Sequence, residues 1–209
     1  PDFIYSDIHM SSTSQMIYEW LAMNGWEGKI NKAAAECLYT GIVTDTGSFR
    51  FSSTTARTHA IAAEFMQLGV KPDEIYNRVF DNNSVSRLKL LGTMLENMRY
   101  FPEKNAVILF LRKADQDALT YSRGDSEGFV NYGLSIGDVK CSIFLREDAD
   151  SIKVSLRSKG EIDVNKLARE KFNGGGHVNA AGGNLEMNLD EALAYAEEVI
   201  GEYQSMLTA

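Results

Sequence analysis

Cysteine, histidine and proline are scarce in this chain of 209 residues, which contains two, three and three of them. The two cysteines, Cys37 and Cys141, do not make a disulfide framework, and neither has the spacing of a zinc site. Each lies in a segment with the composition of a core helix or core strand. We therefore expect buried, reduced thiols, with a single disulfide between them as the open alternative.

Long apolar runs and a secretory signal are absent from the printed sequence. The sequence therefore predicts a cytoplasmic protein without a membrane partner. Its first residues, from Pro1 on, include no basic or disordered lead-in, so we expect a piece of a longer protein. A hydrophobic fraction of 44% and a charged fraction of 24% are those of an ordinary globular protein.

Net positive charge is lacking as well, because the formal net charge is −8. This balance argues against broad, sequence-independent binding to nucleic acid. The segment 153–171 is the exception, with six basic residues against three acidic ones. A local basic pocket in an acidic protein favours a small phosphorylated ligand.

The first half of the sequence has the caps and apolar spacing of helices. We expect helices at 15–21, 31–39, 55–68, from 72 and 84–95. The second half has strand-like segments at 106–111, 138–145 and 151–156, the last two as an antiparallel hairpin, and helices at 164–172 and 189–207. The change of texture at Phe101-Pro102 predicts an α/β protein with a helical domain, 1–101, and an α+β domain, 102–209.

Glycines cluster at Gly174-Gly175-Gly176, directly before His177. Successive amides of such a run can turn to one side and bind an anion, and the histidine can donate to a phosphate oxygen. The alternative is a flexible loop whose histidine caps the next element. Arg157 and Ser158 lie at the end of a predicted strand, and a guanidinium fits a phosphate as a planar fork. We therefore expect Arg157 and His177 on opposite sides of one phosphate, and Lys159 in an exposed turn.

Asp45 stands between two threonines and a glycine, after an apolar stretch. A carboxylate at the mouth of a core element is a ligand for Mg²⁺ or Mn²⁺, although such an aspartate also commonly caps a turn. His59 is expected in a surface or capping role at the start of a helix. His9 precedes the first helix, and one interpretation is that it faces the Asp45 site.

Together these segments resemble the DHH/DHHA1 phosphoesterase family, over nearly the whole chain. The stretch from Gly174 to Gly182 resembles the DHHA1 signature, and Gly41 to Phe49 resembles the last metal-binding motif of a DHH domain. Three further segments fit the same family: 11–18, 127–131 and 157–164. The bacterial oligoribonuclease and phosphoadenosine-phosphate phosphatase branch, often labelled exopolyphosphatase-related, is the most similar.

This resemblance implies the C-terminal part of a DHH catalytic domain followed by a DHHA1 domain with a mixed sheet flanked by helices. It implies a Mn²⁺- or Mg²⁺-dependent hydrolase that acts on short RNA, dinucleotides or 3′-phosphoadenosine 5′-phosphate, and it allows a homodimer. Asp45 would be a metal ligand shared by two ions. The substrate would be held by residues of the DHHA1 domain: Arg157, Ser158, Gly174, Gly175, Gly176 and His177.

The sequence also departs from the family pattern, because it contains neither the family's N-terminal Asp-x-Asp loop nor its Asp-His-His triplet. The chain is expected to start just after that triplet, and one carboxylate does not hold two metals, so we expect little hydrolysis by these residues alone. Asn173 stands where another glycine is expected. The competing classes are a non-catalytic RNA-binding module, as in alanyl-tRNA synthetases, and a nucleotide sensor. The net charge and the Asp45 motif speak against the RNA-binding module.

Overall fold

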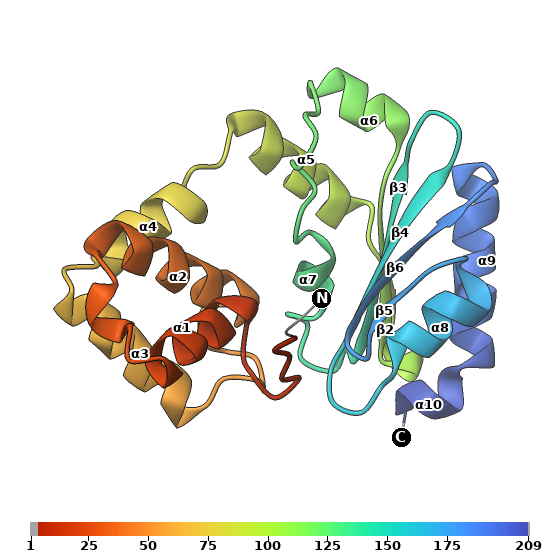
Figure 1. The fold of residues 1–209 in the computed structure, drawn as a ribbon. Coiled ribbons are helices and arrows are strands. Elements are labelled where there is room, and N and C mark those ends of the chain that lie inside the picture. Colours follow the sequence, from red (N-terminus) through yellow and green to blue (C-terminus); the bar gives the residue numbers. More distant parts are fainter. Residues whose placement is uncertain (1–3, 209) are drawn as a thin grey trace. The chain divides into compact units, whose positions relative to one another are not determined.

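A computed structural model describes residues 4–208 of the chain (Figure 1). The chain divides into two compact units, Pro1–Asn82 and Asn83–Ala209. The described part of the first unit is helical, and the described strands lie in the second. The boundary that the sequence suggested, after residue 101, falls inside the second unit, between β1 (Arg99–Phe101) and the 3₁₀-helix η2 (Pro102–Lys104).

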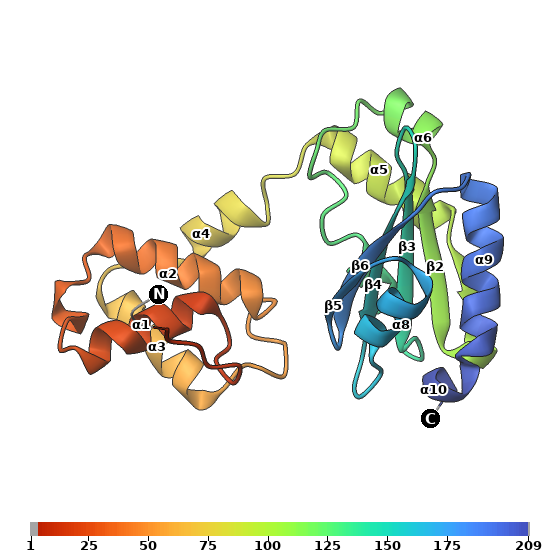
Figure 2. The same ribbon diagram turned by 45° about the vertical axis from the view of Figure 1, so that its right-hand side comes forward.

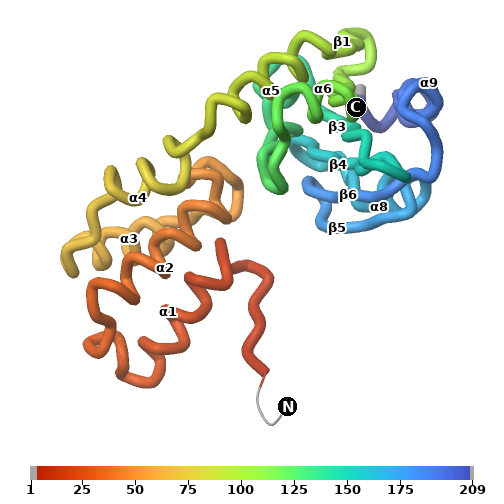
Figure 3. Tube along the Cα trace, turned by 90° about the horizontal axis from the view of Figure 1, so that it is seen from above, coloured from red at the N-terminus to blue at the C-terminus, as the bar shows by residue number. Residues whose placement is uncertain are grey.

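The first unit contains four α-helices and one 3₁₀-helix among its described residues (Figure 3): α1 (Thr13–Met23), η1 (Glu27–Lys29), α2 (Lys32–Asp45), α3 (Ala56–Gln67) and α4 (Pro72–Val79). Side chains of Ser12, Asn31 and Thr55 cap the first turns of α1, α2 and α3. The helices enclose a core of their own, with Ile42, Ile61 and Phe65 fully buried: Tyr18, Ile30, Ala35, Tyr39, Ile42, Val43, Ile61, Ala62, Phe65, Val70 and Ile75.

Helix α2 is longer than its composition suggested, because it continues through Gly41 to Asp45. The glycine does not end the helix. A Cβ at Gly41 would overlap the Ser14 hydroxyl, so the missing side chain lets α1 and α2 pack closely. Burial of Ile42 and Val43 in the next turn then outweighs the low helix propensity of glycine.

The second unit is built on a mixed sheet, as predicted. The sheet has six strands, in the order β1-β2-β3-β4-β6-β5. Neighbouring strands are antiparallel except β2 and β3. The predicted hairpin is formed by β3 and β4. The remaining elements of the unit are α5 (Val85–Glu96), β2 (Ala106–Leu111), α6 (Lys113–Ala118), α7 (Val130–Gly133), β3 (Cys141–Glu147), β4 (Ile152–Ser158), α8 (Val164–Lys171), β5 (Gly175–His177), β6 (Ala180–Leu185), α9 (Leu189–Glu202) and α10 (Gln204–Thr208).

Helices cover this sheet on both faces (Figure 2). Helices α8 and α9 bury Ile108, Ile143 and Val154 on one face. Helices α5 and α7 cover the other face, over Val107 and Leu109. Strand β2 is therefore buried on both sides, which explains its unbroken apolar sequence.

The two cysteines have different environments, and both are free. Cys141 is fully buried in β3, as expected, and burial raises the pKa of its thiol to about 12. Cys37 is exposed, so the prediction of a buried thiol is wrong there. The buried positions of α2 are Ala35, Tyr39, Ile42 and Val43, and Cys37 lies outside that face. Among the described residues, no helix is long and apolar enough to cross a membrane.

Candidate functional site

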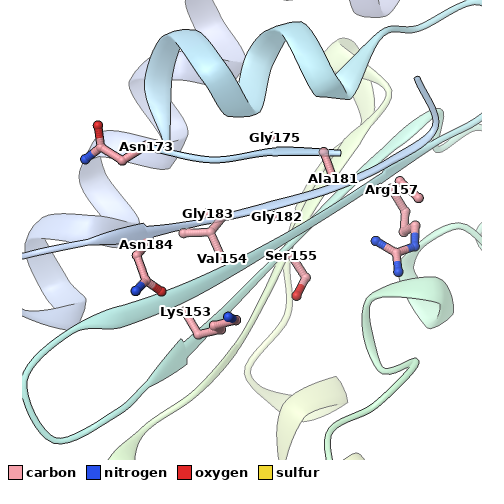
Figure 4. A pocket seen from close by; sticks show the side chains of 11 residues that line it. Lys153, Val154, Ser155, Arg157, Asn173, Gly175, Ala181, Gly182, Gly183 and Asn184 are labelled. Atoms are coloured by element: carbon pink, nitrogen blue, oxygen red, sulfur yellow. The ribbon is translucent and has the colours of Figure 1, made fainter. Parts of the chain in front are cut away.

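Strand β4 alternates between a buried apolar face and a polar face. Ile152, Val154 and Leu156 are buried under α8 and α9. Lys153, Ser155 and Arg157 project from the other face of the sheet, where Figure 4 shows their side chains together with that of Asn184 from β6. The register agrees, because Lys153 pairs with Asn184, Ser155 with Gly182 and Arg157 with Ala180.

On this second face of the sheet, helix α7 contacts the strand residue that pairs with Arg157. The hydroxyl of Ser142, which pairs with Arg157 across β3 and β4, donates to the Val130 carbonyl of α7. A Cβ at Gly133 would overlap that same hydroxyl, so α7 packs tightly at this point. From β4 outward the polar face borders a hollow of about 500 Å³, within the range of small-ligand sites. Its lining is mainly polar side chains and glycine backbone: Lys153, Val154, Ser155, Arg157, Asn173, Gly175, Ala180, Ala181, Gly182, Gly183 and Asn184.

Arg157 is a half-buried, positively charged residue that lines this hollow. Burial lowers the pKa of its guanidinium, while the negative charge of Glu127 acts in the opposite direction. Its Nη1 donates to the Leu156 carbonyl at 2.9 Å, and no ion pair holds it among the described residues. A guanidinium has five N–H donors, so most of its capacity is available to a bound anion.

The glycines before His177 do not form the expected concave row of free amides. Residues Gly175–His177 form the short edge strand β5, paired with β6. The amide of Gly174 donates to the Ala168 carbonyl at 3.1 Å, and that of Gly176 donates to Asn165 Oδ1 at 2.8 Å. Two of the three amides are therefore committed within the protein, and the expectation of a free amide nest is wrong. Backbone pairing and the end of α8, which the sequence did not reveal, use these donors.

Close packing explains why glycine is needed at this edge of the sheet. A Cβ at Gly174 would overlap the carbonyl oxygen of Gly182. Gly176 has φ of 158°, and a Cβ there would lie 2.5 Å from the Ala180 carbonyl oxygen. Asn173, which stands where a glycine was expected, adopts the left-handed conformation with φ of 47°. The glycines thus allow β5 to approach β6.

His177 is exposed and pairs with Ala180, which in turn pairs with Arg157. The three residues therefore form one row across β5, β6 and β4. Two strand spacings put the Cα atoms of His177 and Arg157 about 10 Å apart. That distance leaves room for a phosphate between the two residues, but His177 is not among the residues that line the hollow.

Ser158 lies away from this site. It is buried on the opposite face of β4 from Arg157. Its hydroxyl donates to the Ile162 carbonyl and accepts from Asn179 Nδ2, so it closes the loop that leads to α8. The structure gives Ser158 a structural role instead of the ligand contact expected from its position beside Arg157.

The six basic residues of segment 153–171 have different environments in the structure. Lys166 and Lys171 form ion pairs with Glu170 and Glu202. Lys153 and Arg157 line the hollow. Only part of the positive charge that the sequence concentrates here is therefore presented to a ligand, and Lys159 is exposed in a turn, as predicted.

A second hollow, of about 850 Å³, shares Asn173 and Asn184 with the first. Its charged lining is acidic: Glu147, Asp148, Asp150 and Glu186. An anionic ligand is therefore favoured in the first hollow and repelled from the second. Among the described residues, no group of three histidine, cysteine, aspartate or glutamate side chains is arranged to hold a metal ion.

Asp45 is the last residue of α2, and its side chain is exposed. The next turn contains Gly47, Ser48 and Phe49, all with positive φ, a strained arrangement for the two that are not glycine. The negative end of the helix dipole favours a cation at this place. The ring of Phe49 stacks on His59, whose surface position agrees with the prediction. The backbone amide of His9 donates to Asp7 Oδ1, and the described contacts do not join His9 to Asp45.

Lys153, Ser155 and Asn184 were not among the residues expected at the site. The alternation of polar and apolar residues along β4 was a visible signal for the first two. Asn184 has no such signal, because its place depends on the pairing of β6 with β4.

Comparison with known proteins gives the following similarities. A model of the DHHA1 domain matches residues 103–202. The bifunctional oligoribonuclease and PAP phosphatase NrnA of Bacillus subtilis is 33% identical over 208 residues, or 97% of this chain and 64% of that protein. The cyclic-di-AMP phosphodiesterase GdpP of the same organism is 26% identical over 97% of this chain and 30% of that protein. A crystal structure of an exopolyphosphatase-related protein from Bacteroides fragilis has a TM-score of 0.94 and 39% identity over 99% of this chain and 64% of that one. The chain thus spans less than two thirds of each relative.

Proposed function

Because residues 103–202 belong to the DHHA1 family, as the sequence motifs indicated, we propose that this chain carries the substrate-binding domain of a metal-dependent phosphoesterase. The proposed substrates are short oligoribonucleotides, dinucleotides and 3′-phosphoadenosine 5′-phosphate. The observation that carries the proposal is Arg157, a half-buried guanidinium without an ion pair that faces a polar hollow.

Binding of a phosphate at this place follows from the chemistry of the hollow. The guanidinium of Arg157 donates two parallel hydrogen bonds to phosphate oxygens. Lys153 adds a positive charge along the same strand, and Ser155 and Asn184 offer neutral polar groups. His177 lies in the row of Arg157 and donates from the other side. The hollow is open and small, which suits a nucleotide or a short strand better than a long polyanion.

The proposed phosphoesterase needs a divalent metal, Mn²⁺ or Mg²⁺, and Asp45 is the proposed ligand from this chain. Its carboxylate is exposed at the C-terminal end of α2 and has no hydrogen bond to another described residue, so it fits as one oxygen ligand. A bound metal pair would supply an activated water and stabilise the displacement at phosphorus. The described residues contribute Asp45 to such a centre and no cluster that completes it.

The proposal separates substrate binding, which these residues provide, from hydrolysis, which needs further metal ligands, and this separation can be tested directly. We expect the 209 residues to bind 5′-phosphorylated diadenylate, pApA, in a calorimetric titration and to hydrolyse it little in the presence of Mn²⁺. Arg157→Ala and His177→Ala should each weaken binding about tenfold or more, since hydrogen bonds to charged groups are lost. Lys159→Ala, on the exposed turn next to β4, is the matched control and should bind as the unchanged chain does. Equal affinity of the unchanged chain and the three variants for pApA would contradict the assignment of Arg157 and His177 to the phosphate site. Rapid hydrolysis of pApA by the 209 residues would contradict the proposal that their metal centre is incomplete.

A second candidate function is a non-catalytic nucleotide- or RNA-binding module. The hollow alone would serve either function. Asp45, with its strained following turn, favours the phosphoesterase, because a pure binding module does not need a carboxylate there. In a longer chain that supplies the remaining metal ligands, thermal stabilisation by Mn²⁺ that disappears in Asp45→Asn is expected for the phosphoesterase and not for the module.

A further inference from the structure

The edge strand β5 needs a support that its own sequence does not supply. It consists of Gly175, Gly176 and His177, and it pairs with a neighbour on one side only. Glycine loses more conformational freedom on folding than other residues, so a glycine strand at an edge is weakly determined. Yet this strand carries His177, which the proposed function requires in register with Arg157.

That support comes from Asn165, in the first turn of α8. Its side-chain oxygen Oδ1 accepts a hydrogen bond from the Gly176 amide at 2.8 Å. The same oxygen accepts from Arg169 Nε at 3.1 Å. A Cβ on Gly175 would lie 3.6 Å from both of these groups, so the asparagine and the arginine lie directly against the strand. One oxygen atom thus joins α8 to β5.

Helix α8 is itself held in place by its cap and by the core. The hydrogen bond from the Gly176 amide to Asn165 therefore fixes β5 relative to the rest of the second unit. Asp163 caps the helix by accepting from the amides of Asn165 and Lys166 at 2.9 and 3.0 Å. Leu167 and Ala168 are buried in the core of the second unit. At its other end, the amide of Gly174 donates to the Ala168 carbonyl.

We infer that Asn165 is a positioning residue for the phosphate site: by holding the Gly176 amide it places His177 relative to Arg157. This inference rests on the proposed function and deepens it. The rest of the side chain is partly exposed and no ligand contact is required of it. Its effect on binding passes through the backbone of β5.

The experiment compares Asn165→Ala with Asn165→Asp and with Lys166→Ala in the 209-residue chain. Lys166 is the neighbouring exposed residue, whose ion pair lies within the helix. In ligand-free amide NMR spectra, Asn165→Ala should shift the resonances of Gly176 and His177. Asn165→Asp, which keeps an acceptor oxygen, should restore them. Affinity for pApA should fall about fivefold in Asn165→Ala, the effect of one hydrogen bond, with Tm changed by less than about 4 °C. Lys166→Ala should leave spectra and affinity unchanged.

Two results would overturn the inference. One is an Asn165→Ala protein whose Gly176 and His177 resonances and affinity are unchanged. The other is a general loss of stability with shifts throughout the second unit, which would make Asn165 a plain structural residue. Failure of the unchanged chain to bind pApA would instead contradict the proposed function. The ligand-free spectra would then still decide whether Asn165 holds His177 in place.

Discussion

Arg146 and Arg157, on the neighbouring strands β3 and β4, show how one residue type serves two purposes. Arg146 donates to both oxygens of Asp148 at 2.9 Å and also to Tyr121 and Ser126. Burial acts to lower its pKa, but these partners outweigh it and the pKa is raised. Arg157 has no comparable partner, and burial lowers its pKa. The first arginine completes the fold, and the second is left with unused donors.

This difference predicts opposite effects of the same substitution. Arg157→Met should raise Tm by about 2–4 °C, since a partly buried charge without an ion pair is replaced by an apolar chain. Arg146→Met should lower Tm, because Asp148 and Ser126 lose their partner. Differential scanning calorimetry at neutral pH measures both. A lower Tm in both variants would show that Arg157 also has a structural role.

The two thiols should differ in reactivity because one is buried and the other is exposed. With a pKa of about 12 and no exposed surface, Cys141 should not react with Ellman's reagent in the folded chain. Cys37 should react within minutes, and Cys37→Ser should abolish this fast phase. Addition of denaturant should release the second thiol. Two fast thiols in the native protein would contradict the burial of β3.

At the scale of elements, β5 and β6 are joined by the close approach of their backbones. Glycines at this edge leave space that carbonyl oxygens occupy. Helix α8, the loop closed by Ser158 and the two strands then support each other through hydrogen bonds to main-chain groups. The glycine-rich segment that the sequence marks most clearly therefore determines how closely β5 and β6 pack, and the proposed phosphate contacts come from charged residues such as Arg157.

Gly174→Ala should destabilise the second unit by about 1–3 kcal/mol, because the methyl group would overlap the Gly182 carbonyl and the strands must separate. Gly92→Ala, in the interior of α5 where a Cβ meets open space, is the control. It should stabilise by about 0.5–1 kcal/mol, the usual gain in a helix. Urea denaturation followed by circular dichroism gives both values. Equal stability of the two variants would argue against close packing at β5.

At the scale of the whole molecule, the position of α5 decides where the second unit begins. Leu90 and Met94 of α5 are fully buried against the sheet residues Val107 and Leu109. A chain cut at the change of texture, after residue 101, would lose these side chains. The matched family model, which starts at residue 103, does not include α5 either.

Residues 83–209 should therefore fold alone, whereas residues 102–209 should be much less stable. Burial of two large apolar side chains contributes about 1.5–3 kcal/mol each, a large part of the stability of a domain. Thermal unfolding of the two fragments tests this directly. Binding of pApA by the longer fragment would also locate the phosphate site in the second unit. Similar Tm values would favour the shorter domain.

Local patterns in the sequence were sufficient for most elements. Caps and periodicity indicated the helices, the apolar run of β2 and the hairpin of β3 and β4, because these depend on neighbours in the chain. The predicted final helix is interrupted at Tyr203, between α9 and α10. The strands β1, β5 and β6 were missed. Strands β1 and β5 have three residues each, and both β5 and β6 are rich in glycine, so they have little strand signal of their own. The case of β5 is the clearest. Its existence depends on pairing with β6 and on Asn165.

The sequence by itself determined the resemblance to the DHHA1 family and the residue types of the proposed site, since the motif before and after His177, Arg157 and the Asp45 segment can all be seen in the linear chain. The tertiary structure decided which of their groups are available. It committed the amides of Gly174 and Gly176, buried Ser158 and brought Lys153, Ser155 and Asn184 to the face of Arg157. The physical reason is that a donor is free only if no distant segment uses it, and the side of a strand that a residue faces is set by its partners in the sheet.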